Sequence, residues 1–338
     1  MTTQTPNAAP VPGAFNPQDV LRAQVRWRAL EIIFWVATLA PFILTPNYLV
    51  LCSQVAIAAL FALSLDLLVG YSGLVSLGHA VFFGFGAYSA GLLAKYGWGE
   101  PITGLFFAAV VAGIVGYLVS FIMVRITHFA LIMVSLGLCL LVFELANQLH
   151  DVTGGDDGLQ GIKMWPIFGL YRFDLYGRTA YVYTLAVLFL SFLCLRRVVN
   201  SPFGLSLRGM RENQRRMPAI GAPMKKRLQV VYVIAAAFAG LAGALSAQTT
   251  QFVALDALSF QRSAEILVML VLGGAGRLYG GLIGAAIFIV ARDQLADMNP
   301  QYWYFWLGLL LVIVIIFLPN GILGGLAALA ARVRGRRS

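Results

Sequence analysis

Apolar residues follow one another in long runs along most of the chain, and polar residues gather in a few stretches between them. A hydrocarbon core about 30 Å thick needs about 20 mostly apolar residues per helix, and windows of that length are apolar almost from end to end. The run LLLVIVIIFL at 309–318 lacks the alternation of a membrane β-barrel strand. The pattern predicts an all-α, polytopic integral membrane protein.

The positions of the runs predict about ten transmembrane helices, some of them short or broken. The expected spans are 29–45, 48–69, 79–95, 101–123, 128–148, 179–195, 228–247, 264–275, 279–291 and 302–318. The stretch GGAGRLYGG breaks the pair at 264–291 into two halves that each look too short to span comfortably. Glycine-interrupted segments in both halves of a transporter point towards a pathway between repeats, so a pseudo-repeat is a hypothesis here.

The polar stretches predict one membrane domain with a tail at each end. Residues 1–28 are polar and lack the charged start, short apolar stretch and cleavage site of a signal peptide, so we expect a retained, largely disordered tail. A single transmembrane domain is expected over 29–326, followed by a basic tail over 327–338. Two long loops interrupt the domain, at 149–178 and 196–227.

Composition and charge set the orientation. Of 338 residues, 60% are hydrophobic and 11% are charged, which is typical of a membrane protein. The loop 196–227 holds nine basic residues and one acid, so it is expected in the cytoplasm together with both termini. Counting 264–291 as two crossings returns the basic C-terminus to that side. An anionic inner leaflet explains the net charge of +10, so no nucleic acid is expected as a partner.

The loop 149–178 is then external and is longer than helix packing requires. Its TGGDDG core combines the backbone freedom of glycine with acceptors at Asp156 and Asp157. Its aromatic residues are Trp165, Phe168, Tyr171 and Phe173. They predict an ordered, functional loop, and the alternative is an aromatic belt at the membrane interface.

The cytoplasmic loop carries the most specific pattern. Ser201-Pro202 predicts a serine N-cap with proline at the first helical position, followed by a short helix from about Phe203 to Met217. Pro218 ends this helix, because the residue before a proline is biased away from helical geometry. We expect a rigid, basic, solvated knob that docks into a cleft of a partner protein. The alternative is a helix that lies on lipid headgroups.

The segment SPFGLSLRGMRENQRRMPAIGA resembles the cytoplasmic coupling segment of the permeases of branched-chain amino-acid ABC transporters. The residues that match this pattern, and that the resemblance implies for coupling to the ATPase, are Ser201, Phe203, Gly204, Leu207, Arg208, Arg211, Glu212 and Gly221. The segment departs from the pattern at Asn213 and Gln214, where acids are common, and at Pro218, where a helix former is usual.

Other stretches resemble the same family in the same order. GYSGLVSLGHAVFFGFGAY is similar to its first-half signature, TGGDDGLQGI to its external loop, and LVMLVLGGAGRLYGGLIGAA with FLPNGILG to its C-terminal region. The chain looks most like the longer of two permease types and is also similar to urea-transport permeases. The resemblance implies a bacterial inner-membrane importer of branched-chain or related amino acids. Its partners would be a second permease, two ATP-binding subunits and an external solute-binding protein, and its mechanism alternating access.

No chemistry of the chain's own is expected. It has no G-x-x-x-x-G-K-[ST] loop and no Gly-Lys pair, so ATP hydrolysis belongs on partner chains. Its three histidines lack the i, i+4 spacing of a helical metal pair, and its three cysteines lie in apolar runs. We therefore expect no catalytic site, metal or cofactor. Transport of urea or another small carboxylate or amide, and a stand-alone carrier or channel, remain open alternatives.

Polar groups within the spans are candidates for the translocation pathway. A charge at mid-bilayer costs about 2.5 to 3.5 kcal/mol on insertion scales, so it should face other helices or a wet cavity. Glu144 and Asn147 lie one turn apart, suitably placed for a substrate's ammonium group. The candidates are Ser76, His79, Phe83, Glu144, Asn147 and Glu265. The alternative for each of them is a packing residue.

The segment 70–91, GYSGLVSLGHAVFFGFGAYSAG, combines both kinds of feature. Its first part is expected to be broken, non-helical backbone covered by protein or water. If the rest is helical, one face carries Ser76, His79 and Phe83 and a neighbouring face carries only small residues. The small residues are Ala80, Gly84, Ala87 and Gly91. Such a stripe lets helix backbones approach closely in lipid.

Overall fold

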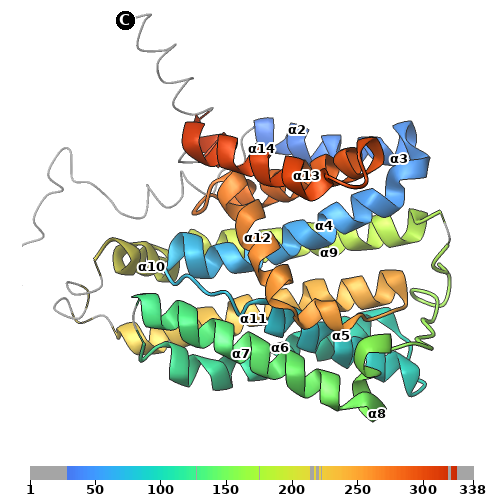
Figure 1. Cartoon of the computed structure of the whole chain (residues 1–338), viewed down its shortest axis with the longest axis horizontal. Coiled ribbons are helices and arrows are strands. Elements are labelled where there is room, and N and C mark those ends of the chain that lie inside the picture. The colour runs from blue at the N-terminus through green and yellow to red at the C-terminus, as the bar shows by residue number, and fades with distance from the viewer. Residues whose placement is uncertain are drawn as a thin grey trace, which may run out of the picture.

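The apolar runs form the helices of a bundle in the computed structural model of this chain (Figure 1). The structure describes residues 29–126, 128–174, 176–213, 217, 221, 223–318 and 321–325. The long helices are α4 (Leu49–Asp66), α6 (Pro101–Met123), α7 (His128–Gln148), α9 (Arg178–Val199), α11 (Met224–Thr250) and α13 (Leu278–Met298). Each lies in a segment that is long and apolar enough to cross a membrane.

Shorter helices complete the bundle. They are α2 (Ala29–Ala37), α3 (Ala40–Leu44), α5 (Ala80–Lys95), α8 (His150–Thr153), α10 (Pro202–Glu212), α12 (Phe260–Gly273) and α14 (Trp303–Phe317). Single turns are η1 (Pro46–Tyr48), η2 (Leu67–Tyr71), η3 (Gly155–Asp157) and η5 (Leu255–Leu258), of which η2 has π-helical geometry. Within the described residues only two isolated β-bridges occur. The prediction of an all-α, polytopic protein is confirmed.

Every expected span coincides with a helix or a pair of helices, but the broken pair differs from its prediction. The second half, α13, has 21 residues and is long enough to cross, so the expectation that both halves are too short is wrong. The first half, α12, has 14 residues and crosses the neighbouring helices obliquely (Figure 1). At 1.5 Å per residue it is about 21 Å long, shorter than the hydrocarbon core.

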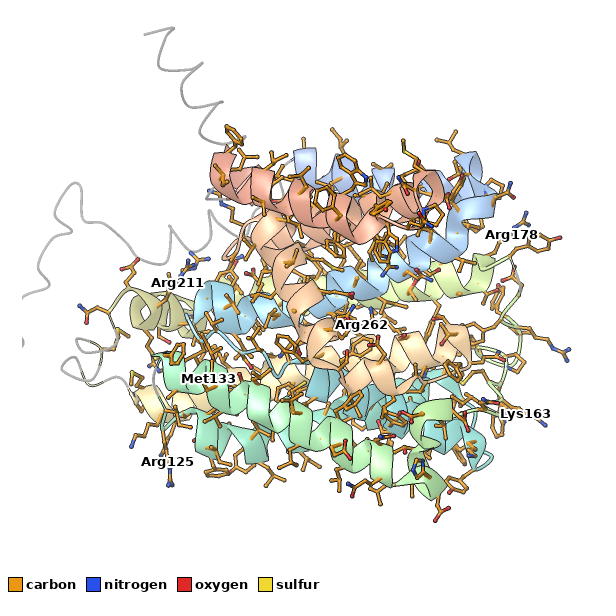
Figure 2. All side chains as sticks on the ribbon, viewed as in Figure 1. Arg125, Met133, Lys163, Arg178, Arg211 and Arg262 are labelled. Carbon is orange, nitrogen blue, oxygen red and sulfur yellow. The ribbon has the colours of Figure 1, made fainter. Side chains whose placement is uncertain are left out.

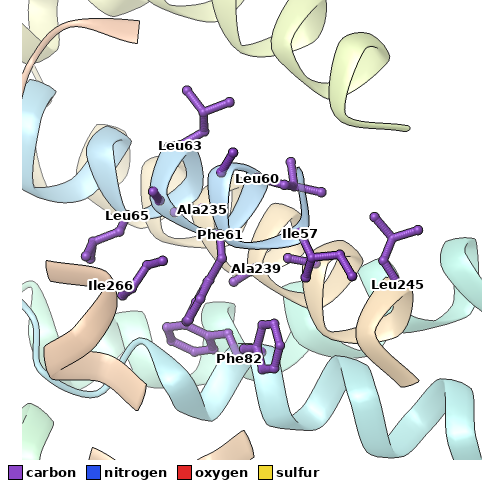
Figure 3. Close-up of a cluster of buried hydrophobic side chains, with 14 of the residues drawn as sticks. Ile57, Leu60, Phe61, Leu63, Leu65, Phe82, Ala235, Ala239, Leu245 and Ile266 are labelled. Atoms are coloured by element: carbon purple, nitrogen blue, oxygen red, sulfur yellow. The ribbon is translucent and has the colours of Figure 1, made fainter. Parts of the chain in front are cut away.

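Helices α4 and α11 form the centre of the bundle. About three fifths of each span is buried, against a third for α6 and about a fifth for α7, which lie at its outside. Phe61 of α4 packs against the Phe83 ring of α5 and belongs to the same buried cluster as Ala239 of α11 and Ile266 of α12 (Figure 3). At Gly86 of α5, a methyl group would collide with the backbone of Gly240 in α11. Glycine at these positions allows the close backbone contact that stabilises helix pairs in lipid.

The small-residue stripe of α5 also packs closely, as predicted. A side chain at Gly84 would collide with Leu258, and one at Gly91 would crowd Leu159 and Val253. The segment 72–79 before α5 is not helical, which confirms the expected break. It enters the bundle from the end where α10 lies (Figure 1).

Basic residues gather at the two ends of the bundle, and most lie at the end of α10. Figure 2 shows Arg125 and Arg211 at that end and Lys163 and Arg178 at the opposite end. The first turn of α2 also lies at the α10 end, because Glu31 forms an ion pair of 2.7 Å with Arg196. The expected tails, 1–28 and 327–338, lie outside the described residues.

The loop 149–178 is ordered, as its aromatic residues predict. Leu159 and Val253 exchange backbone hydrogen bonds of 2.9 and 3.2 Å, and the Trp165 amide donates to the Gly99 carbonyl over 2.8 Å. Phe173 packs edge-on against Tyr183, whereas Trp165, Phe168 and Tyr171 are exposed. The loop, which connects α7 to α9, therefore covers the bundle end opposite α10. Its hydrogen bonds to Val253 attach it to the connection between α11 and α12.

Helix α10 begins as predicted and ends earlier. The Ser201 hydroxyl accepts a hydrogen bond of 3.3 Å from the Gly204 amide, which confirms the N-cap. The helix ends at Glu212, because Asn213 takes an extended conformation, so the expected continuation to Met217 is wrong. Residues 214–216 and 218–220 lie outside the described part.

Candidate functional site

A polar cavity of about 220 Å³ lies among the central helices. Its polar lining comes from α4, α11, α12 and α13 and consists of Gln54, Ser246, Thr249, Thr250, Arg262, Glu265 and Arg292. Its apolar lining consists of Ile57, Ala58, Phe61, Phe83, Ile266, Met269 and Ile289. Figure 2 shows Arg262 in the middle of the molecule, between the two basic ends. The cavity is smaller than the roughly 300 to 1,000 Å³ of sites for drug-sized ligands, so it suits a small solute.

The start of α12 positions the charged groups of the cavity. The Ser259 hydroxyl caps the helix by accepting from the Arg262 amide over 3.1 Å, and it donates to Asp256 over 2.8 Å. Glu265 follows one turn after Arg262, so both side chains lie on the face that lines the cavity. Charged side chains in a membrane span are expensive, and they mark solute or ion pathways more often than they serve packing.

The ion pairs around Arg262 are loose. Its guanidinium lies 3.5 Å from the Glu265 carboxylate and 3.9 Å from that of Asp256, whereas a charge-assisted hydrogen bond is typically about 2.7 to 2.9 Å. It also lies 6.0 Å from the centre of the Phe83 ring. Its Nε donor is buried and has no hydrogen-bond partner among the described atoms. Arg262 therefore keeps unused capacity to bind an anion.

The lining carries two arginines and one glutamate, and the Asp256 carboxylate adds a second acid 3.9 Å from Arg262. No ion pair involves Arg292 within the part of the chain that the structure describes. The arrangement can hold a small solute that carries an anionic group.

A second cluster joins α10 to the membrane helices. The Arg211 guanidinium donates to the carbonyl of Gly70, in the turn η2, and Arg208 lies 5.3 Å from the centre of the Tyr71 ring. One turn before Gly70, the buried Asp66 carboxylate accepts a hydrogen bond of 2.7 Å from the amide of Gly276. We call these contacts the α10 anchor. The anchor links α10 to the end of α4 and to the loop between α12 and α13.

Sequence comparison assigns the chain to a family of membrane proteins. Residues 47–315 match the family model described as the permease component of the branched-chain amino acid transport system. The chain belongs to this permease family.

The relatives of this permease include both named types of the transport system. It is 30% identical to LivM, the high-affinity branched-chain amino acid transport system permease protein of Escherichia coli K12, over 91% of this chain and 78% of that one. It is 26% identical to a probable LivM of Methanocaldococcus jannaschii, over 78% of this chain and 89% of that one. Escherichia coli LivH is 24% identical over 79% of this chain and 91% of its own. No solved structure matches the chain.

Only part of the expected pathway set lines the cavity of the permease. Phe83 and Glu265 do, and the structure brings them together through Arg262. Glu144 lies on the exposed face of α7, where its carboxylate accepts from Gln148 over 3.1 Å. Asn147 is on the same helix, away from the cavity lining.

Ser76 and His79 are buried in the core instead. The His79 ring stacks on Phe61 at 5.4 Å, and its Nε2 lies 2.9 Å from the Ser64 hydroxyl. That hydroxyl donates to the Phe61 carbonyl over 2.6 Å, so we infer that it accepts from His79. These contacts help to fix the non-helical segment, and the Ser135 hydroxyl also binds its Leu77 amide.

The expected coupling residues fall into three groups. Arg208 and Arg211 belong to the α10 anchor, although Arg211 is also exposed. Glu212 and Gly221 are exposed, and Gly221 has a positive φ of 80°.

The remaining members attach α10 to the bundle. Ser201 and Gly204 hold α10 against the end of α9, where a side chain at Gly204 would collide with the Val199 carbonyl. Phe203 is partly buried against the core, and Leu207 is fully buried, so the expectation of a wholly solvated knob is wrong for this side of α10.

Sequence reasoning missed six polar cavity residues: Gln54, Ser246, Thr249, Thr250, Arg262 and Arg292. Gln54 is a polar residue inside an expected span and was therefore visible in the sequence. The two arginines lie one or two residues outside the expected boundaries of 264–275 and 279–291. The i, i+3 spacing of Arg262 and Glu265 was a signal that could have revealed Arg262.

Proposed function

We propose that this chain is a permease subunit of an ABC importer and that the importer carries branched-chain amino acids through alternating access. ATP-binding subunits would dock on the exposed side of α10, and an external solute-binding protein would deliver the substrate to the end covered by residues 149–178. The names of the relatives, which are branched-chain amino acid transport permeases, support this substrate class. A second permease, similar to this one, would complete the membrane part.

The α10 anchor is the observation that carries the coupling part of this proposal. Movement of α10 acts on Gly70 through Arg211, and Asp66 ties the same turn to the loop at Gly276. That loop joins α12 and α13, which both line the cavity. A displacement imposed by an ATPase on α10 therefore has a continuous path of contacts to the cavity walls.

The proposed docking of ATP-binding subunits on α10 requires that the α10 end of the bundle face the cytoplasm, and we propose that both termini lie on that side. The ion pair of Glu31 with Arg196 supports this placement for the N-terminal side, because it holds the start of α2 at the α10 end. The basic residues at that end agree with the positive-inside rule.

Reconstitution tests the proposal. The chain is purified with its partner permease and ATP-binding subunits, inserted into proteoliposomes and supplied with the solute-binding protein and labelled leucine. ATP-dependent uptake is expected, and it should vanish when the ATP-binding subunits are omitted. Leucine uptake by the chain alone would identify a stand-alone carrier, and uptake of urea but not leucine would overturn the substrate class.

A further inference from the structure

We propose that the cavity is a binding site for the zwitterionic head of an amino acid, with Arg292 and Arg262 binding the carboxylate and Glu265 binding the ammonium group. This inference rests on the proposed import function and extends it to a defined site within this one subunit. Three features of the cavity support it: the charges of its lining, the incomplete pairing of those charged groups, and the apolar side chains that lie beside them.

The first observation is the charge balance. The lining holds two guanidinium groups and the Glu265 carboxylate, and a second carboxylate, that of Asp256, lies 3.9 Å from Arg262. Both ion pairs belong to Arg262, so the positive charge without an ion pair among the described residues is that of Arg292. A planar guanidinium can bind a carboxylate with two parallel hydrogen bonds, whereas a solute without a carboxylate would leave Arg292 without such a partner.

The second observation is that the groups are held in position without being saturated. Phe83, Asp256 and Glu265 surround the Arg262 guanidinium, but both of its ion pairs are longer than a direct charge-assisted bond. Glu265 has Arg262 as its ion-pair partner at 3.5 Å within the described residues. An ammonium group placed beside Glu265 can therefore bind its carboxylate while the substrate carboxylate takes the free donors of the arginines.

The third observation is that the cavity has both charged and apolar lining residues. Ile57, Ile266 and Ile289 come from three different helices and line the same cavity as the charged groups. Branched aliphatic side chains offer an apolar wall to an aliphatic solute, whose burial contributes about 25 cal/mol per Å². A charged head beside an aliphatic tail is the chemistry of a branched-chain amino acid, whereas urea has no such tail.

A cysteine reporter tests the charge of the cavity independently of transport. The native cysteines are replaced first by Cys52→Ala, Cys139→Ala and Cys194→Ala. Ala58→Cys, on the cavity wall, then supplies the only thiol of this chain, and its labelling is read on this chain after the subunits are separated. In the reconstituted complex, an anionic methanethiosulfonate should react several-fold faster than a cationic one of similar size. Arg292→Gln should reduce this preference, and Arg178→Gln, at the loop-covered end, should preserve it. Equal rates for both reagents would overturn the proposal.

Protection of the same thiol by ligands assigns the two heads. Leucine should slow the labelling, and Glu265→Gln should weaken its protection by about tenfold or more, as expected for one charge-assisted bond. Protection by 4-methylpentanoate, which has the carboxylate but no ammonium group, should not weaken in Glu265→Gln and should weaken in Arg292→Gln. Asp293→Asn, beside the cavity lining, is the matched control for loss of an acid and should leave both ligands unaffected.

Leucine uptake is measured on the same preparations, so that failure of the site and failure of the function differ. Normal uptake together with unchanged protection in Glu265→Gln and Arg292→Gln would overturn the site and leave the import function standing. Absence of ATP-dependent leucine uptake by the unsubstituted complex would overturn the import function itself.

Discussion

The two ends of α4 carry polar chemistry of opposite kinds. At its C-terminal end, Asp66 is fully buried and accepts a short hydrogen bond from the Gly276 amide. Towards its N-terminal end, α4 lines the cavity, where Arg262 and Glu265 lie 3.5 Å apart and Arg292 is unpaired among the described residues. A buried carboxylate that accepts from the backbone of another segment holds helices together, whereas a charged group that faces a cavity with spare donors can bind a solute. In the functions proposed above, the first end of α4 transmits movement and the second binds solute.

The sharpest way to break this comparison is to remove Asp66. Asp66→Ala leaves the half-buried Gly276 amide without its acceptor, so the free energy of unfolding should fall by about 1 to 3 kcal/mol. Glu265→Gln should leave the free energy of unfolding nearly unchanged, because Glu265 forms only a loose ion pair of 3.5 Å with Arg262 at the cavity. Chemical denaturation of both variants in detergent micelles measures the difference. Equal losses would mean that the two ends of α4 do not differ in kind.

The next effect concerns transmission through the α10 anchor. Arg211→Ala removes the donor to the Gly70 carbonyl, so leucine uptake per ATP hydrolysed should fall by about tenfold, within the usual range of coupling free energies. Membrane insertion and ATP hydrolysis should persist. Arg125→Ala removes an exposed arginine at the same end and serves as the control. Uptake and hydrolysis that stay coupled in Arg211→Ala would exclude this contact from the mechanism.

A smaller effect distinguishes the core near His79 from the cavity. Ser64→Ala removes the hydroxyl beside His79 Nε2, and it should lower the free energy of unfolding by about 1 kcal/mol, the net value of a typical hydrogen bond. The apparent KM for leucine uptake should stay the same, because neither residue lines the cavity. An altered KM with unaltered stability would place the pathway at this segment.

The smallest effect is expected at Glu144. Its carboxylate accepts from Gln148 on the exposed face of α7, so Glu144→Gln keeps an acceptor there and should change the KM for leucine by less than about twofold. Transport assays at several leucine concentrations measure it. A change of tenfold or more would move substrate contact from the central cavity to the outer face of α7.

Features that depend on neighbours in the sequence could be predicted from it. The apolar runs predicted the position of every long helix, because a helix long and apolar enough to cross a bilayer needs a long hydrophobic run. Ser201 and Pro202 predicted the start of α10, because capping uses groups three residues apart. The glycines of the segment 70–91 predicted a break followed by close packing, which the contacts of Gly84 and Gly91 confirm.

The end of α10 and the length of α13 could not be placed in the same way. Pro218 indicated a stop, but the helix ends at Glu212, because Asn213 already has an extended backbone. The polar residues at the end of α13, including Arg292, made the helix look shorter than it is, because a hydropathy window ends where charges begin.

Tertiary structure alone decided which polar groups meet. Asp66 and Gly276 are 210 residues apart, and Arg211 and Gly70 are 141 residues apart, so no local pattern could pair them. The same holds for the cavity, where Arg292 of α13 joins Arg262 and Glu265 of α12 and Gln54 of α4. Hydropathy and capping act over a few residues and fix the helices. The partners of a buried charge depend on how those helices pack, since only packing sets which donors and acceptors come within hydrogen-bond distance.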